Sequence, residues 1–135
     1  MKSISKILLV LAVLLVGVAS VSARKAPGSK VGAEFSTLVF DFGTVNADKG
    51  SVEHKFIMTN TGTQPVAILT AVPSCGCTVA DYSKKPIEPG EATTIKVKFN
   101  LAGQRGEINK DVKLRLKSAS ATERVTLKIK GVVIP

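Results

Sequence analysis

Apolar and polar residues alternate along much of this chain. In the segment 51–60, every second residue belongs to one mainly apolar face, formed by Val52, His54, Phe56 and Met58. Three later segments, 94–99, 112–117 and 125–130, alternate between aliphatic or aromatic side chains and lysine, arginine or threonine. Successive side chains of a β-strand point to opposite faces, so this pattern predicts strands that each bury one face.

Turn-forming residues separate these segments. The run Glu88-Pro89-Gly90-Glu91 is typical of a type II turn, because proline presets φ at the first corner and glycine supplies a positive φ at the second. Further turns are expected at 60–62, 102–103 and 118–122, and no segment beyond the N-terminal apolar run has helical periodicity. About seven short strands in roughly 100 residues predict an all-β, antiparallel β-sandwich.

The N-terminus has the composition of a secretory signal peptide. Lys2 and Lys6 precede an apolar run from Ile7 to Val16, and small residues then lead to Ala23. A bilayer span needs about 20 apolar residues, so a cleaved signal is favoured over a retained membrane anchor. We therefore expect a signal peptide at 1–23, a flexible lead-in at 24–32 and one domain at 33–135. The mature protein is expected to be exported, to the periplasm or the cell surface.

Several short motifs occur in an order that resembles a known family. They are Phe40-Asp41-Phe42-Gly43, His54-Lys55-Phe56, Asn60-Thr61-Gly62, Pro73-Ser74-Cys75-Gly76-Cys77-Thr78, Pro86-Ile87-Glu88-Pro89-Gly90-Glu91 and the late Gly131. The chain resembles, over roughly 34–133, the bacterial domain-of-unknown-function family numbered 1573, which is common in exported proteins of the Bacteroides group (Bacteroidetes). The resemblance implies an immunoglobulin-like sandwich of the sperm-protein and pilus-chaperone type, and it implies no activity.

Composition argues against an enzyme. The chain has 19 Lys and Arg against 10 Asp and Glu, a single histidine and no tryptophan. Removal of the leader, with Lys2 and Lys6, lowers the formal charge from +9 to about +7. With one histidine and few acidic residues in apolar surroundings, little of the chain is suited to acid–base catalysis.

The two cysteines, Cys75 and Cys77, allow several interpretations. In an extended segment their Cα atoms would be ~6.6 Å apart, which makes a disulfide feasible but strained. Two thiolates on one face also suit copper(I), with His54 or Met58 as a further ligand from an inward strand face. The pair could equally exchange electrons as a redox couple, or be two small buried residues. A structural role is favoured, with metal and redox roles as alternatives.

The last two predicted strands carry a basic face. Lys113, Arg115 and Lys117 alternate on the first of them, and Arg124, Lys128 and Lys130 lie on the second. If the strands are neighbours, these cations form one patch that could attract a polyanion or an anionic membrane surface. An ordinary solvated face is the favoured interpretation, and nucleic acid is not expected because the cations have no aromatic neighbours.

These observations predict an exported, non-enzymatic binding or scaffolding domain of the bacterial envelope, whose partner is an envelope protein or a glycan. The alternative is a small copper or thiol-redox carrier that uses Cys75 and Cys77. No cofactor other than copper is expected.

Overall fold

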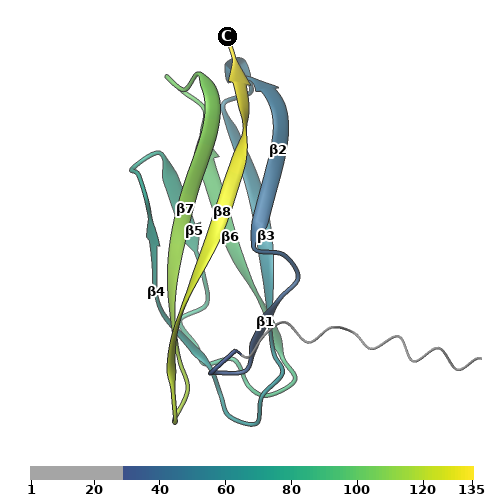
Figure 1. Cartoon of the computed structure of the whole chain (residues 1–135), viewed down its shortest axis with the longest axis vertical. Helices are drawn as coiled ribbons and strands as arrows, with labels where there is room; N and C mark the ends of the chain where they lie inside the picture. The colour runs from purple at the N-terminus through teal and green to yellow at the C-terminus, as the bar shows by residue number, and fades with distance from the viewer. Residues whose placement is uncertain (1–28) are drawn as a thin grey trace, which may run out of the picture.

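The computed structural model describes residues 29–135, so the predicted signal peptide at 1–23 lies outside the described residues. In this described part of the chain, eight strands and one short 3₁₀-helix follow one another (Figure 1). Their bounds are β1 Ala33–Phe35, β2 Val39–Asn46, η1 Ala47–Lys49, β3 Ser51–Asn60, β4 Ala67–Pro73, β5 Thr78–Asp81, β6 Ala92–Asn100, β7 Gly106–Lys117 and β8 Thr122–Ile134. Within residues 29–135 there is no helix long and apolar enough to cross a bilayer.

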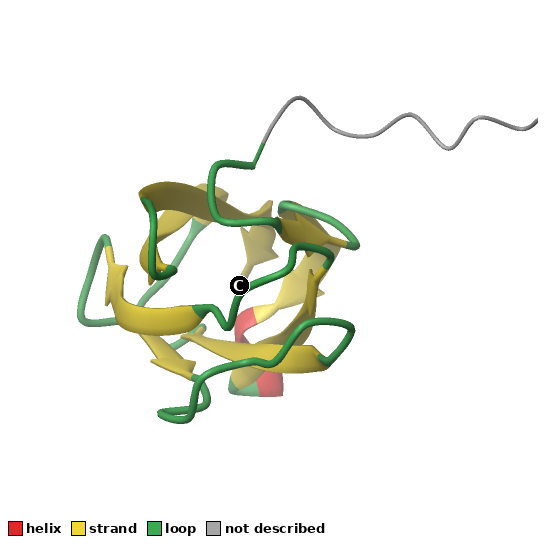
Figure 2. Cartoon of the chain, turned by 90° about the horizontal axis from the view of Figure 1, so that it is seen from below, coloured by secondary structure: helices red, strands yellow, loops and turns green. Residues whose placement is uncertain are grey.

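The strands form two packed sheets of four strands each, ordered β1-β3-β6-β5 and β2-β8-β7-β4. Seen along the long axis, the two sheets enclose a common interior (Figure 2). The predicted all-β sandwich is therefore confirmed. Neighbouring strands are antiparallel except for β2 and β8, which are parallel. The chain pairs with β3 of the first sheet as β1 and then joins the second sheet as β2.

The alternation seen in the sequence determines which side chains form the core. Phe56 and Met58 of β3, Ile95, Val97 and Phe99 of β6, and Leu114, Leu116, Leu127 and Ile129 of β7 and β8 are all at most 1 % exposed. Phe42 of β2 lies directly over Gly131 of β8, where any Cβ atom would overlap the ring of Phe42. Gly131 therefore lets an aromatic ring of the edge strand reach Phe99 in the other sheet.

Residues 29–32, which precede the expected domain start at residue 33, are packed in the structure. The side chain of Val31 is 5 % exposed, and the hydroxyl of Ser29 donates to the carboxylate of Glu123 at 2.7 Å. The same carboxylate accepts from the N–H of Val31. Residues 29–32 are therefore packed against β8, in contrast to the flexible lead-in that their polar composition suggested, because one apolar side chain and one carboxylate hold them.

Asn60 links three segments at the end of the sandwich where β3 finishes. Its side chain is fully buried, and its amide donates to the carbonyls of Gln64 at 2.7 Å and Ile87 at 2.9 Å. Its side-chain oxygen accepts from the N–H of Gly62 at 3.0 Å. The Asn60-Thr61-Gly62 turn is thus tied to the isolated bridge between Val66 and Ile87. Val66 belongs to the connection that leads from β3 in one sheet to β4 in the other.

Replacing Asn60 with alanine should lower the free energy of unfolding by on the order of 3 kcal/mol, because three hydrogen bonds are lost and buried backbone groups are left without partners. Urea denaturation of Asn60→Ala and of the exposed control Asn109→Ala would measure the difference. Equal stability of the two variants would show that Asn60 does not hold these segments together.

Candidate functional site

The edge of β3 exposes backbone groups that can accept another strand. The N–H of Ser36 donates to the carbonyl of Ile57 at 3.0 Å, so the backbone of Ile57 faces away from β6. Every second residue shares this direction, which places the N–H and C=O groups of Ser51, Glu53 and Lys55 on the same edge. β1 pairs only with residues 58–60, and none of these six groups has a hydrogen-bond partner among residues 29–135. The edge from Ser51 to Lys55 is open.

The edge of β2 is capped by side chains. The hydroxyl of Thr37 accepts from the N–H of Val39 at 3.2 Å and donates to the carbonyl of Val39 at 2.9 Å. Farther along, the carboxylate of Asp41 accepts from the N–H of Gly43 at 2.8 Å, where the register with β8 shifts. Local side chains thus occupy backbone groups that a new strand would need.

The edges of β4 and β5 are interrupted or short. The N–H of Ser74 donates to the carbonyl of Asp111 on β7, so the preceding residue, Pro73, faces the outer edge and has no N–H to offer. A register shift near Leu69 further distorts β4. β5 has only four residues, and the N–H of Thr78 is bonded to the carbonyl of Cys75. Neither strand offers a continuous edge like that of β3.

The side chain of His54 points from the open part of β3 towards the interior between the two sheets. Its ring stacks on Phe40 of β2, with centroids 4.2 Å apart and planes 12° apart. It also forms a T-shaped pair with Phe56, with ring centroids 4.6 Å apart. Burial among these rings lowers the pKa of His54 below its usual 6.5. The stack closes the interior between β2 and β3 with aromatic side chains.

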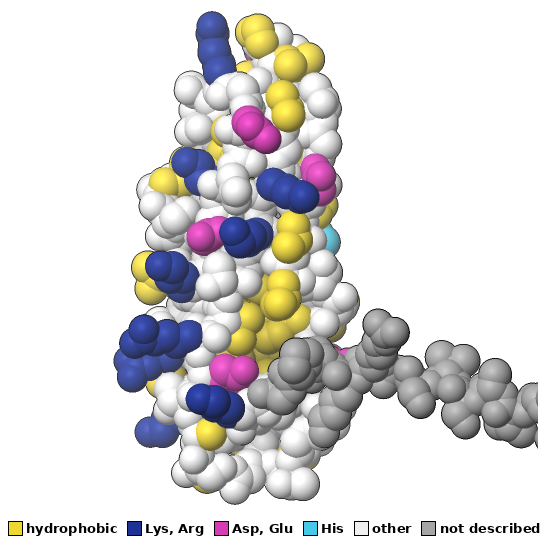
Figure 3. Space-filling view, in the orientation of Figure 1, with side chains coloured by type: hydrophobic (Ala, Val, Ile, Leu, Met, Phe, Trp, Pro, Cys, Tyr) yellow, Lys and Arg dark blue, Asp and Glu magenta, His cyan; other side chains and the backbone are white. Residues whose placement is uncertain are grey.

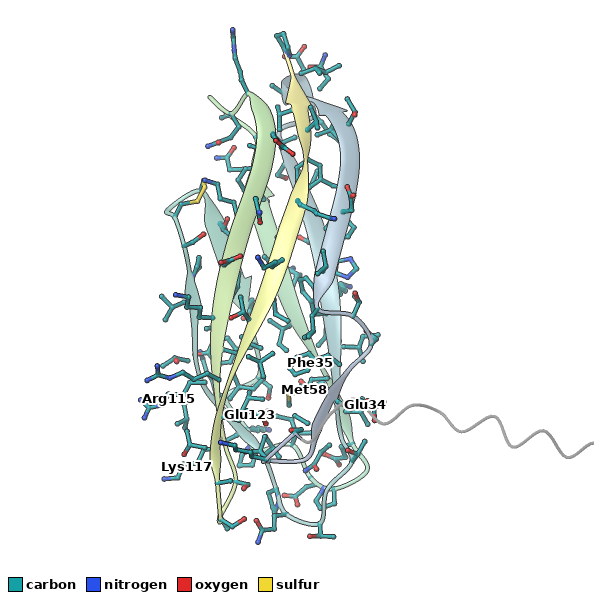
Figure 4. The ribbon with its side chains drawn as sticks, in the orientation of Figure 1. Glu34, Phe35, Met58, Arg115, Lys117 and Glu123 are labelled. Atoms are coloured by element: carbon teal, nitrogen blue, oxygen red, sulfur yellow. A yellow bond between two sulfur atoms is a disulfide. The ribbon has the colours of Figure 1, made fainter. Side chains whose placement is uncertain are left out.

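Cys75 and Cys77 form a disulfide in the connection between β4 and β5, drawn as a yellow bond in Figure 4. The N–H of Thr78 donates to the carbonyl of Cys75 at 3.3 Å, which closes a turn around Gly76. The turn brings the two Cα atoms to 5.3 Å, nearer than the ~6.6 Å expected of an extended segment. Both cysteines are half-buried, and the disulfide lies on an outer loop of the sandwich.

The predicted copper ligands are not brought together. His54 packs against β2, on the opposite side of β6 from β5, whereas the sulfurs of Cys75 and Cys77 are joined to each other near Thr78. Met58 is fully buried in the core. No group of three or more His, Cys, Asp or Glu side chains suited to a metal occurs among residues 29–135.

The predicted basic residues do share one surface, the outer face of β7 and β8. Arg115 is paired with Arg124, and Lys113 with Thr126, in the antiparallel register of these strands. Figure 3 shows lysine and arginine side chains along one side of this face, and Figure 4 shows Arg115 and Lys117 extending away from it. The register also pairs Lys128 with Asp111, and their charged groups are 3.8 Å apart.

The sequence motifs did not identify the open edge as a site. The alternation of residues 51–60 predicted β3, but how much of its outer edge is covered depends on β1, which has only three residues. The caps on β2 have a readable signal, since threonine or aspartate two residues before the capped N–H is typical of side-chain turns. The sequence could not show that Asn60 links three segments, because one of its hydrogen-bond partners, Ile87, is 27 residues away along the chain.

The stability of the protein should fall as pH decreases from 7 towards 5. His54 has a lowered pKa in the folded state, so the unfolded chain takes up its proton first as pH falls through about 6.5. His54→Phe has no titrating group at this position and should lose less stability over the same interval. Urea midpoints at pH 7 and pH 5 would test this, and identical losses in the two proteins would contradict it.

The disulfide should contribute little to stability. It closes a ring of only three residues, for which the chain-entropy relation gives about 1.5 kcal/mol. Cys75→Ser, Cys77→Ser should therefore stay folded, with an unfolding free energy reduced by no more than about that amount. Denaturation of the oxidised protein, the reduced protein and the double variant would measure this, and loss of folding would assign the disulfide a central structural role.

Solved structures with the same fold belong to proteins of different kinds and from different organisms. The VesB protease of Vibrio cholerae matches with a TM-score of 0.65 and 18 % identity, over 75 % of this chain and 32 % of that one. The PapD-like domain 7 of human CEP192 matches with a TM-score of 0.61 and 16 % identity, over 85 % and 96 %. The E. coli chaperone DraB matches with a TM-score of 0.54 and 7 % identity, over 75 % and 55 %.

At these identities the likeness shows the fold alone, and it confirms the immunoglobulin-like sandwich. This chain spans about a third of the length of VesB. No curated protein gives a significant match to the sequence. The family model described as "Protein of unknown function (DUF1573)" matches residues 33–133. The chain therefore belongs to the DUF1573 family, as its motifs predicted.

Proposed function

We propose that this chain is an exported, non-enzymatic binding domain of the bacterial envelope, and that it binds an extended segment of a partner protein at the open edge of β3. Ser51, Glu53 and Lys55 present a row of backbone N–H and C=O groups that have no partner within residues 29–135, and this row is the basis of the proposal. Addition of a strand to such an edge supplies main-chain hydrogen bonds for affinity. The capped and interrupted edges of β2 and β4 leave β3 as the favoured place for it.

The side chains around this edge define the chemistry of the partner segment. Towards the interior, a new strand would meet His54 and the ring of Phe40 stacked on it. Towards solvent, it would meet Glu53 and Lys55, and Ile57 is 45 % exposed nearby. We expect a partner segment with apolar or aromatic residues at alternate positions and residues of either charge between them.

Two further observations support export and a binding role. The disulfide between Cys75 and Cys77 is typical of proteins in oxidising compartments, in agreement with the leader expected at 1–23. The chaperone DraB has the same fold, although at 7 % identity that likeness carries no partner over to this chain.

Lys55→Pro should abolish partner binding while leaving the sandwich intact. The N–H of Lys55 faces the open edge, so proline removes a donor that a partner would use and no bond to β6. A photo-reactive benzoylphenylalanine in place of Glu53 would report the partner as a cross-linked adduct in cells. The adduct should persist in Lys55→Ala, which keeps the backbone N–H, and should be lost in Lys55→Pro.

The same photo-reactive residue in place of Thr70, on the interrupted edge of β4, is the positional control and should give no such adduct. Circular dichroism and thermal unfolding of Lys55→Pro establish that it is folded. An adduct that survives in folded Lys55→Pro, or that forms equally from position 70, would rule out strand addition at β3.

The second candidate function is a thiol-disulfide carrier, favoured by the half-buried disulfide on an outer turn. In that role a partner dithiol would pass two electrons and two protons to the Cys75–Cys77 bond and become a disulfide itself. Cys75→Ser, Cys77→Ser separates the two functions. The double variant should keep the adduct at position 53 if β3 is the binding site, and a carrier would lose thiol exchange with its partner.

A further inference from the structure

The basic face of the second sheet consists of two electrostatically different halves. Towards the C-terminal end of β8, Lys128 lies 3.8 Å from Asp111, and Lys130 is paired with Asp41 of β2 in the parallel register. Towards the β7–β8 hairpin, the outward residues of β4, β7 and β8 include no acid. Four cations, Lys113, Arg115, Lys117 and Arg124, form this second half, which we call the uncompensated patch.

The register of β7 and β8 places two arginines of the patch side by side. Arg115 and Arg124 are directly opposite each other, which puts their Cβ atoms about 5 Å apart. Lys113 and Lys117 lie two residues to either side of Arg115 on the same face, about 7 Å along the strand. Like charges at directly opposed positions destabilise a sheet unless a counter-charge lies between them. The arrangement is therefore suited to an anion held against this face.

Apolar side chains border the patch. In the register of β4 and β7, Val72 lies opposite Lys113, and Thr70 opposite Arg115, so these side chains share the outer face. Val72 is 57 % exposed, and Leu69, at the register shift of β4, is 42 % exposed. Figure 3 shows hydrophobic atoms beside the cations along this side of the molecule. Cations next to exposed aliphatic groups match a bilayer surface, where phosphates lie directly above hydrocarbon.

We propose that the uncompensated patch binds the surface of an anionic phospholipid bilayer, with Arg115 and Arg124 on lipid phosphates and Val72 and Leu69 at the headgroup boundary. A soluble polyanion would bind the cations and leave the aliphatic side chains in water. A bilayer surface would contact the cations and the aliphatic side chains together. The site is independent of the open edge of β3, which belongs to the other sheet, and either proposal can fail without the other.

Sedimentation of the purified protein with vesicles tests the proposal. Vesicles with 30 % phosphatidylglycerol in phosphatidylcholine should bind the protein, pure phosphatidylcholine vesicles should not, and 0.5 M salt should release it. Each cation near an anionic surface contributes about five-fold to affinity, so Arg115→Gln, Arg124→Gln should weaken binding about 25-fold. The charge-matched control Lys128→Gln, Lys130→Gln should bind nearly as the unaltered protein does, because acids already offset those lysines.

Val72→Ser distinguishes lipid from free phosphate as the ligand. It should weaken binding to the phosphatidylglycerol vesicles and leave binding to soluble polyphosphate unchanged. Equal losses of vesicle binding in the two double variants would show that only the net charge of the protein matters, and would overturn the proposal. So would unaltered vesicle binding in Arg115→Gln, Arg124→Gln, equal binding to phosphatidylcholine, or a Val72→Ser variant that binds vesicles as well as the unaltered protein.

Discussion

The outermost strands of the two sheets determine how this domain is built, because their outer backbone groups have no neighbouring strand to bond. A sandwich of two four-stranded sheets has edge strands whose N–H and C=O groups must be capped, interrupted or left to bind something else. Thr37 and Asp41 cap β2, Pro73 interrupts β4, and β5 is too short to offer a ladder. Among the strands within residues 29–135, only β3 keeps several such groups available along its edge, because β1 covers just its last three residues.

The aromatic stack behind the open edge supports β3 where its outer side has no neighbouring strand. β3 is bonded to β6 along its inner side, and the stack of His54 on Phe40 adds contacts from β2 in the opposite sheet. Gly131 contributes from farther inside, because its missing side chain lets Phe42 approach Phe99. The open edge is thus backed by packed rings, which favours a preformed binding site over one that must fold around its partner.

The two proposed binding surfaces are compatible with one orientation of the molecule. The uncompensated patch covers β7, β8 and the neighbouring face of β4, while the open edge belongs to β3 in the other sheet (Figure 1). A domain that rests on a bilayer through Arg115 and Arg124 would keep the edge from Ser51 to Lys55 away from the lipid. A partner segment could then be bound close to the membrane surface and still be accessible from the aqueous side.

Periodicity predicted the strands well because each one buries a single face, as in residues 112–117 and 125–130. Periodicity could not predict which residues of neighbouring strands lie opposite each other, and this register determines which surface charges are neutralised. The opposition of Arg115 and Arg124 follows from the register of β7 and β8, and the neutralisation of Lys128 by Asp111 follows from the same register. The spacing of Cys75 and Cys77 allowed a disulfide, yet the turn at Gly76 that brings their Cα atoms to 5.3 Å is closed by a hydrogen bond from the N–H of Thr78 to the carbonyl of Cys75.

Amide hydrogen exchange, followed residue by residue by NMR, distinguishes an open edge of β3 from a paired one. In the protein alone we expect the N–H groups of Glu53 and Lys55 to exchange nearly as fast as in an unstructured peptide, whereas those of His54 and Phe56, bonded to β6, should be strongly protected. Bound partner should protect Glu53 and Lys55 and leave Ala71 of β4 unchanged. Strong protection of Glu53 and Lys55 in the protein alone would show that the edge is already paired, and would rule out an open edge on β3.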